Sequence, residues 1–203
     1  MADKVAKWSS GASYGPVLSQ TDLYLLNPTL EIHPILCGKS PKFQLVFNLS
    51  NGHSGGFNPD QRDADLPFNA KDEPATLPRV QQLYIVTDIT PWCTTVKNDR
   101  GVTMNDICQA MWRDYSEHYV TDTEFGTLPP RLQEQVKRAS SSRGAQNAHW
   151  NMYYSPGQAA TRFRRFDWLR DRYYFESLRR DDGYAESRLG FKAPNIFVMS
   201  LTA

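Results

Sequence analysis

The chain has 203 residues, of which 23 are Lys or Arg, 22 are Asp or Glu, four are His and three are Cys, and its formal net charge is +1. This length suits a single domain. Apolar residues make up 40% and aromatic residues 12%, enough to fill a core, which excludes a wholly disordered chain. The near-neutral charge argues against a dedicated nucleic-acid-binding protein, and no apolar run reaches the ~18 residues of a membrane span.

The spacing of the cysteines and the composition of the N-terminal residues indicate in which cellular compartment the protein is expected. The N-terminal stretch lacks the apolar segment of a secretory signal. Cys37, Cys93 and Cys108 are too scattered for a disulfide framework or a metal site. We therefore expect a cytoplasmic protein with reduced thiols that has no membrane contact, no cofactor and no bound metal.

The beginning of the chain is predicted to be irregular. Residues 1–22 show no hydrophobic period and are predicted to form a flexible N-terminal arm. Residues 23–203 are predicted to form one domain. Within residues 23–36, Pro28 and Pro34 favour an extended conformation over a helix.

A strand and a long loop are expected next. Phe43, Leu45 and Phe47 alternate with other residues, and this period of two predicts a strand. Turn-forming Gly, Asn and Pro pairs then punctuate residues 48–78, which predicts a long loop. Loops of this length inside a compact domain are either functional or disordered.

The clearest elements lie in the middle of the chain. Residues 82–87 predict a strong strand and residues 94–97 a weaker one. Thr103 is the expected N-cap of a helix, with Asp106 three residues later to favour the positive end of the helix dipole. The apolar residues of this helix recur at spacings of three and four, namely Met104, Ile107, Cys108, Met111, Trp112, Tyr115 and Tyr119.

The last third of the chain adds a helix and a final strand. Pro130 opens a helix that residues 140–144 are expected to end. Residues 149–154 are apolar enough to dock on the core, and residues 195–201 predict a buried strand. The predicted fold class is α+β, a mostly antiparallel sheet of about four or five strands with two or three helices packed on one face.

Four short blocks, in the same order, resemble a known family. They are IHPIL at residues 32–36, LYIV at 83–86, PWCTTV with GVTMNDI across 91–107, and RRFDWL at 164–169. These blocks are similar to the HPxL, WPxTV, GVTxxD and RRVDWL motifs of a domain family of unknown function from mushroom-forming basidiomycete fungi, although Cys93 and Phe166 replace the family's Pro and Val. The resemblance implies an α+β domain with a strand at residues 164–169, and it implies no activity.

Two residues have the chemistry of a reactive site. His33 can act as a general base or metal ligand if partners surround it, but His53, His118 and His149 are scattered along the chain. The other interpretation is a histidine that hydrogen-bonds to backbone at the start of a strand. Cys93 can be a nucleophile if its pKa is lowered, or else an inert buried thiol.

Residues 161–188 form an arginine-rich stretch. Eight Arg alternate with aromatic residues there, which is typical of a platform for single-stranded RNA. Six acidic residues in the same stretch favour an ion-paired surface instead, and Asp167 can be a buried carboxylate paired with an arginine.

The predicted function is an intracellular binding module that recognises a protein partner or a small apolar ligand, because ten Tyr, ten Phe and five Trp exceed the needs of a small sheet. The alternative is a small-molecule enzyme of the lyase, isomerase or cyclase type, with His33 or Asp167 as acid or base. RNA binding through residues 161–188 is a weaker alternative, and a homodimer is compatible with each. The predicted pocket residues are His33, Trp92, Arg165, Asp167 and Tyr173.

Overall fold

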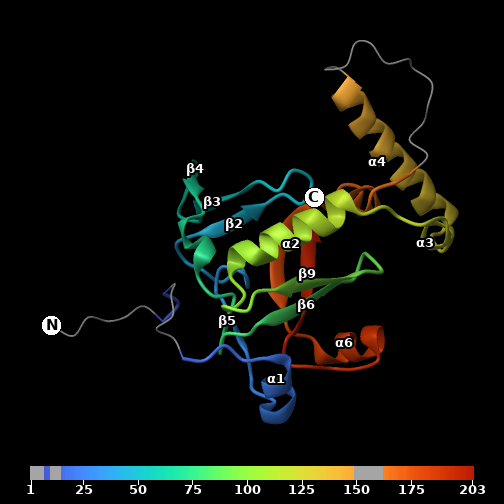
Figure 1. Cartoon of the computed structure of the whole chain (residues 1–203). Helices are drawn as coiled ribbons and strands as arrows, with labels where there is room; N and C mark the ends of the chain where they lie inside the picture. The colour runs from blue at the N-terminus through green and yellow to red at the C-terminus, as the bar shows by residue number, and fades with distance from the viewer. Residues whose placement is uncertain (1–6, 10–14, 149–161) are drawn as a thin grey trace.

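The computed structural model describes residues 7–9, 15–148 and 162–203. Within these residues the chain forms three sheets and six α-helices (Figure 1). The predicted mixture of α and β structure is therefore confirmed. The docking segment predicted at residues 149–154, and much of the predicted N-terminal arm, lie outside the described residues.

A four-stranded sheet forms the centre of the molecule, in the order β7–β6–β9–β8. Its strands are β6 (Gln82–Thr87), β7 (Cys93–Lys97), β8 (Tyr174–Arg179) and β9 (Ile196–Thr202). The three strands that the sequence predicted here are confirmed. Antiparallel pairing dominates as expected, but β6 and β9 run parallel.

The prediction of a long loop at residues 48–78 is wrong. This segment holds β3 (Ser54–Asn58) and β4 (Gln61–Pro67), which join β2 (Gln44–Phe47) in a three-stranded antiparallel sheet. The short helix η1 (Asn69–Asp72) follows, and β5 (Thr76–Leu77) then pairs with β1 (Glu31–Ile32). The Gly, Asn and Pro residues that suggested a loop punctuate short strands instead.

One glycine shows how tightly this small sheet is built. A Cβ atom at Gly56 would lie 2.3 Å from the Gln44 carbonyl oxygen and 2.4 Å from Cζ of Phe43. The strand interior therefore needs a residue without a side chain, because another backbone passes too close.

The helix α2 (Met104–Glu117) begins at Thr103, as predicted. The Thr103 side chain accepts from the Asp106 N–H at 3.1 Å, and an Asp106 oxygen accepts from the Thr103 N–H at 2.9 Å, which is a capping box. Most of the predicted apolar stripe is buried, but Trp112 is 36% exposed and Tyr119, beyond the helix end, is 47% exposed.

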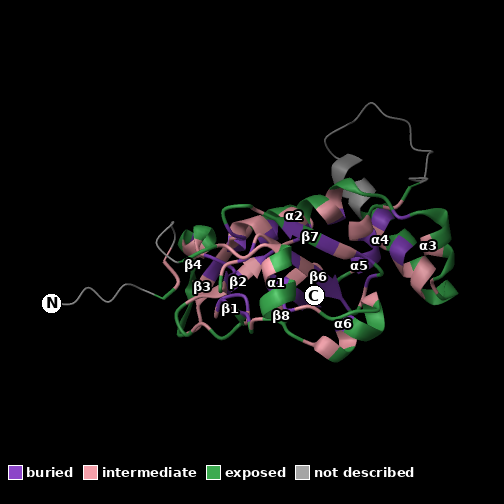
Figure 2. Ribbon diagram, turned by 60° about the horizontal axis from the view of Figure 1, so that its bottom comes forward, coloured by how far each residue is buried: buried purple, intermediate pink, exposed green. Residues whose placement is uncertain are grey.

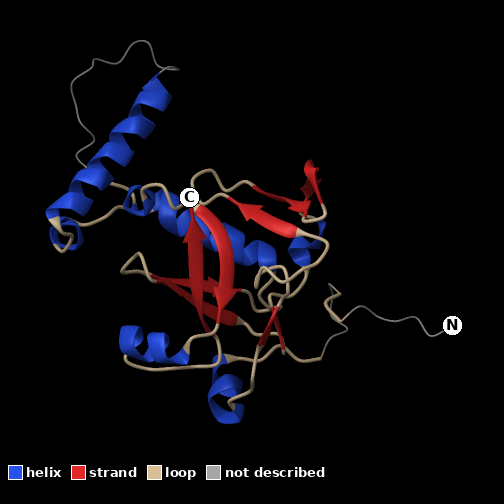
Figure 3. Ribbon diagram, turned by 180° about the vertical axis from the view of Figure 1, so that it is seen from behind, coloured by secondary structure: helices blue, strands red, loops and turns tan. Residues whose placement is uncertain are grey.

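The helices do not all lie on one face of the central sheet. The main core contains Leu83, Ile85, Phe197 and Met199 from alternate positions of β6 and β9, together with the buried side of α2. The intervening residues, Val86, Ile196 and Val198, are also buried but lie outside this cluster. The helix α6 (Asp182–Leu189) contacts β9, and its buried Ala185 also lies outside the main core. Alternation along the strands therefore places α2 and α6 on opposite faces (Figure 3).

The helix α1 (Gln20–Leu26) corrects the prediction of an extended chain over residues 23–36. Ser19 caps it through a reciprocal hydrogen-bond pair with Asp22, and Asn27 ends it with φ = 41°. Pro28 therefore follows the helix rather than interrupting it. Before α1, Leu18 forms a parallel bridge to Val80, so this described part of the predicted arm contacts the domain.

Three further helices gather at one end of the molecule with α6 (Figure 2). They are α3 (Asp122–Gly126), α4 (Pro130–Ala148) and α5 (Arg165–Leu169). The structure corrects two predictions here: α4 continues through residues 140–144, and residues 165–169 form a helix rather than a strand. The later turns of α4 extend away from the sheets (Figure 1).

No helix in the described part of the chain combines the length and apolar character needed to cross a bilayer.

Candidate functional site

His33 is built into the structure beside the β1–β5 pair. It is 4% exposed, and its Nδ1 atom accepts a hydrogen bond of 3.2 Å from the Ile35 N–H. Its Nε2 atom therefore carries the proton and donates a hydrogen bond of 3.0 Å to Glu73 Oε2. The Trp8 ring packs edge-on against the imidazole at a centroid distance of 4.6 Å. Burial lowers the pKa of His33, although the Glu73 carboxylate acts in the opposite direction. Both ring nitrogens are thus engaged in local structure.

Trp92 and Arg165 form a second cluster, where β7, α2, α3 and α5 meet. The Arg165 guanidinium lies 4.7 Å from the centroid of the Trp92 ring and forms an ion pair with Asp114 of α2. Trp92 Nε1 donates to Glu124 at 2.6 Å. Trp92 also contacts Trp168 edge-on at 5.1 Å. These contacts fix α5 against the sheet and α2.

Asp167 lies in the same region and is 1% exposed. Its Oδ2 atom accepts a hydrogen bond of 2.8 Å from the Arg164 N–H, so the carboxylate stabilises the first turn of α5. The structure therefore brings Trp92, Arg165 and Asp167 together. His33 is held by a different set of neighbours, from the segment between η1 and β5, from Ile35 and from Trp8.

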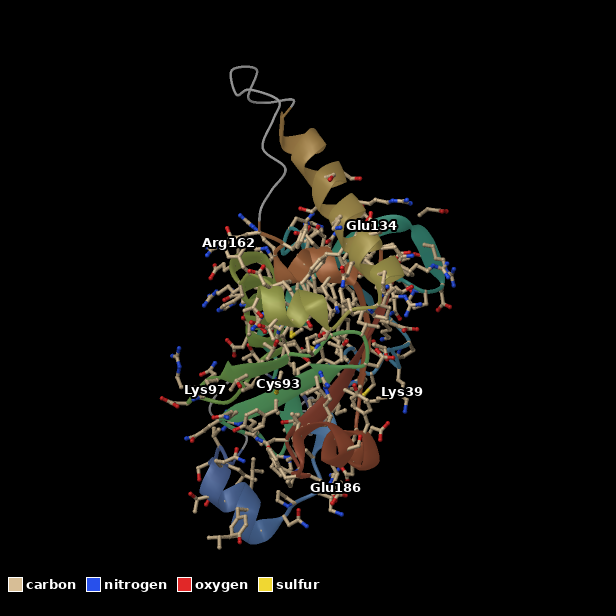
Figure 4. All side chains as sticks on the ribbon, turned by 90° about the vertical axis from the view of Figure 1, so that its right-hand side faces the viewer. Lys39, Cys93, Lys97, Glu134, Arg162 and Glu186 are labelled. Carbon is tan, nitrogen blue, oxygen red and sulfur yellow. The ribbon has the colours of Figure 1, made fainter. Side chains whose placement is uncertain are left out.

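The cysteine thiols are poorly suited to nucleophilic chemistry. Burial raises the pKa of Cys37 and of Cys93, and it raises the pKa of Cys108 to about 12. Since the thiolate is the reactive form, these shifts oppose activation. Cys93 lies on β7, in the middle of the molecule (Figure 4). In the portion that the structure describes, no group of three or more His, Cys, Asp or Glu side chains could hold a metal ion.

Tyr173 lines an open groove of about 920 Å³ beside α4. We call it the α4 groove. Its walls come from α4, from α5 and the turn after it, from the start of β8, and from the turn after β2. The lining residues are Asn48, Ser50, Asn51, Gln135, Arg138, Ala139, Ser142, Arg164, Phe166, Arg170, Asp171, Tyr173 and Tyr174.

Three aromatic rings form a row in the α4 groove. The Phe166 and Tyr173 rings lie 5.7 Å apart, and the Tyr173 and Tyr174 rings lie 5.0 Å apart. The turn after β2 holds this row in place, because the Leu49 N–H donates to the Tyr173 carbonyl at 2.9 Å and Asn48 bridges to Tyr174. Backbone pairing between distant segments therefore positions the rings.

The charges of the α4 groove are mostly positive. Arg138, Arg164 and Arg170 line it against the single carboxylate of Asp171, a formal charge of +2. Arg138 and Arg164 are exposed. None of the three guanidinium groups forms an ion pair with a carboxylate of the described residues. The groove thus combines arginines that lack an ion-pair partner among the described residues with three half-buried aromatic rings.

Five residues of the groove were not predicted from the sequence, namely Arg138, Arg164, Phe166, Arg170 and Tyr174. Four of the five belong to the arginine-rich stretch at residues 161–188, so its composition was a usable signal. Arg138 lies on α4, and only the packing of α4 against α5 places it at the same groove.

A comparison with protein-family models shows which family the chain is related to. Residues 43–186 match the model of a family of unknown function, DUF6699, which covers more than half of the sequence. The chain belongs to the DUF6699 family. The expectation of an uncharacterised family is thereby confirmed. The fungal origin implied by the sequence blocks stays a prediction, and the block at residues 32–36 lies outside the matched range.

The α4 groove of this DUF6699 chain is built from residues inside the matched range, since all of its lining residues lie between 48 and 174. The search of curated proteins found no match, and neither did the search of solved structures.

Proposed function

We propose that this domain is a binding module that recognises a protein partner by an extended acidic segment held in the α4 groove. The observation that carries the proposal is the convergence on one open groove of a row of three aromatic rings and three arginines, none of which forms an ion pair with a carboxylate of the described residues. Arg and Tyr are enriched at the energetic centres of protein interfaces, and guanidinium groups bind carboxylates in a bidentate manner.

The engagement of the candidate catalytic residues favours binding over catalysis. The alternative, a small-molecule enzyme with His33 or Asp167 as acid or base, requires a free ring nitrogen or a carboxylate open to substrate. Both His33 nitrogens have partners, and Asp167 is buried at the start of α5. Each of these residues is explained by its structural contacts.

The shape of the groove favours a peptide over a small apolar ligand. Its volume of about 920 Å³ lies at the upper end of the ~300–1,000 Å³ range of small-molecule sites. Its lining is rich in amide, hydroxyl and guanidinium groups, which suit the backbone and carboxylates of an extended chain. Of the five residues predicted for a pocket, Tyr173 contacts the ligand in this proposal, whereas Trp92, Arg165 and Asp167 support α5 beneath it.

A peptide library displayed on phage, selected with the purified chain, tests the proposal. We expect the enriched peptides to be rich in Asp and Glu. A fluorescent copy of one enriched peptide then serves as the probe in anisotropy titrations. Arg138→Gln combined with Arg164→Gln should weaken its binding about tenfold or more, since each lost charge pair is worth on the order of 1 kcal/mol. Tyr173→Ala should weaken it as well.

Arg131→Gln is the matched control, because Arg131 is exposed on the same helix but does not line the groove. It should bind the peptide as the wild type does. Enrichment of basic or uncharged peptides would contradict the proposal. So would equal affinities of the Arg131 and Arg138/Arg164 variants.

A further inference from the structure

A second recess lies on the neighbouring face of α4. It measures about 230 Å³ and is bounded by α4, the end of α5, α6 and the β6–β7 turn. We call it the α6 cleft. Its apolar surface comes from Ile89, Pro91, Leu128, Leu132, Val136 and Trp168. Since Leu132 and Val136 lie one helical turn apart, this surface forms a continuous wall along α4.

Two guanidinium groups reach this apolar wall from different elements. Arg188, near the end of α6, donates from Nη2 to the Thr90 carbonyl at 3.0 Å. Arg170, just after α5, donates from Nη1 to Gln135 at 3.2 Å. Each guanidinium is therefore oriented by one hydrogen bond and keeps further N–H donors.

The charge of these two arginines is not neutralised locally. Neither Arg170 nor Arg188 pairs with a carboxylate in the described ranges. The buried Nε atom of Arg170 has no hydrogen-bond partner there. Asp88 is the one acidic residue lining the cleft, and its side chain is exposed to solvent. A desolvated N–H of a cation without an acceptor is costly, and an anionic ligand would supply the acceptor.

The backbone at Arg170 is a separate observation. Its φ of 62° and ψ of −99° place it near the first central position of a type II′ turn, and the Arg172 N–H closes that turn on the Leu169 carbonyl at 3.0 Å. Glycine dominates this position because a side chain is strained there. An arginine in a strained conformation beside a cleft is the type of outlier that accompanies a binding role.

We propose that the α6 cleft binds a small monocarboxylate with a compact aromatic or branched apolar body. The carboxylate accepts hydrogen bonds from Arg170 and Arg188, since a planar guanidinium matches its two oxygens. The apolar body lies against Leu132, Val136 and Trp168. The volume lies below the ~300–1,000 Å³ of sites for drug-sized ligands, so the ligand is smaller than those. This site shares Arg170 with the α4 groove but is otherwise lined by different residues, and it does not rest on the proposed function.

Benzoate is the probe, with benzamide as its neutral isostere and inorganic phosphate as an anion without an apolar body. NMR titration of the ¹⁵N-labelled full chain should show saturable benzoate binding in the millimolar range or tighter. We expect the shifted amides to cluster at residues 88–90 and 184–188. Binding of benzamide or phosphate should be at least about tenfold weaker than that of benzoate, as expected when one charged hydrogen-bonded pair is lost.

Two substitutions locate the site. Arg188→Gln should weaken benzoate binding about tenfold without affecting benzamide, whereas Arg180→Gln should have no effect, because Arg180 pairs with Asp182 outside the cleft. Leu132→Trp fills the cleft and should abolish binding even if the Arg188 variant folds poorly. Arg138→Gln should impair peptide binding only, and Arg188→Gln benzoate binding only, so the two proposals fail separately.

Three results would overturn the inference. They are an absence of saturable benzoate binding, equal binding of benzoate and benzamide, and amide shifts that map away from the α6 cleft.

Discussion

Arg170 shows how one side chain can serve two surfaces. It lines both the α4 groove and the α6 cleft, and its N–H donates to the Asp167 carbonyl at 3.2 Å to end α5. The positive φ of this residue requires a backbone conformation that L-amino acids rarely adopt, and such strain costs on the order of 1–3 kcal/mol. The fold therefore holds an arginine where glycine would be more stable.

We expect Arg170→Gly to be more stable than Arg170→Ala, by about 1 kcal/mol or more, because only glycine relieves the strain at positive φ. Both variants lose the hydrogen bond to Gln135, so their difference isolates the backbone effect. Urea unfolding measures it. If the Arg170→Ala variant were instead more stable than the Arg170→Gly variant, the turn would carry no backbone strain.

His33 gives the chain a defined response to acid. Burial lowers the pKa of His33 below its ordinary value of 6.5, so the unfolded chain takes up this proton at a higher pH than the folded chain does. The stability that His33 contributes is therefore full above the unfolded pKa and falls as the pH drops through 6.5 towards the lower folded value.

His33→Gln removes this titration while keeping a donor for Glu73. We expect the difference in free energy of unfolding between wild type and His33→Gln to shrink from about pH 7.5 to about pH 5. Urea titrations at each pH measure it. A difference that stays constant, or grows on acidification, would contradict the depressed pKa.

At the scale of elements, α4 is the wall shared by both candidate sites. It contacts α5, and its Val136 is 1% exposed yet lies outside the main hydrophobic core. Ser140, one turn later, is also buried, at 5% exposure. The helix α4 is thus held by a small packing contact that is separate from the main core. Disrupting this contact should leave the central sheet folded.

We expect Val136→Lys to release α4 without unfolding the molecule, because it buries an ammonium group beside Arg170 and Arg188, which line the same contact, and an unpaired buried charge costs several kcal/mol. Hydrogen exchange should show lost protection in α4 and retained protection in β6 and β9. Binding at both candidate sites should be impaired. Arg131→Lys, at an exposed position of the same helix, should change neither property. Cooperative loss of the whole sheet would show that α4 is integral to the core.

At the scale of the whole molecule, charge is balanced in total and separated locally. The chain carries 23 basic and 22 acidic residues. Just before α6, Arg179 pairs with Asp181 and Arg180 pairs with Asp182. Arg165 is paired with Asp114 beneath α5. The arginines of the α4 groove, which form no ion pair within the described residues, are thus a limited patch that is too small for a long phosphate backbone.

We therefore expect weak RNA binding with a shallow salt dependence. Affinity for RNA falls with log[salt] in proportion to the number of neutralised phosphates, with a slope of about −0.7 per phosphate for single strands. Anisotropy titrations of a single-stranded oligouridine at several salt concentrations measure this slope. Tight binding at low salt with a steep slope would favour the RNA-binding alternative for residues 161–188 over peptide recognition.

The sequence alone determined the elements whose evidence is local. The capped helix α2, the strands β6, β7 and β9 and the mixed fold class follow from periodicities and caps within a few residues. It failed at α1 and α5, where capping carboxylates outweighed the evidence for extended chain. It also failed at residues 54–67, where turn residues hid a pair of short strands.

Only the tertiary structure decided what the helices at one end of the molecule enclose. The rings and arginines of the α4 groove come from α4 and from residues 164–174, and the α6 cleft adds the β6–β7 turn and α6. No local pattern records that α4 packs on α5, or that β9 lies parallel to β6. These contacts depend on burying apolar surface between distant segments, a property of the whole folded chain rather than of any single window of residues.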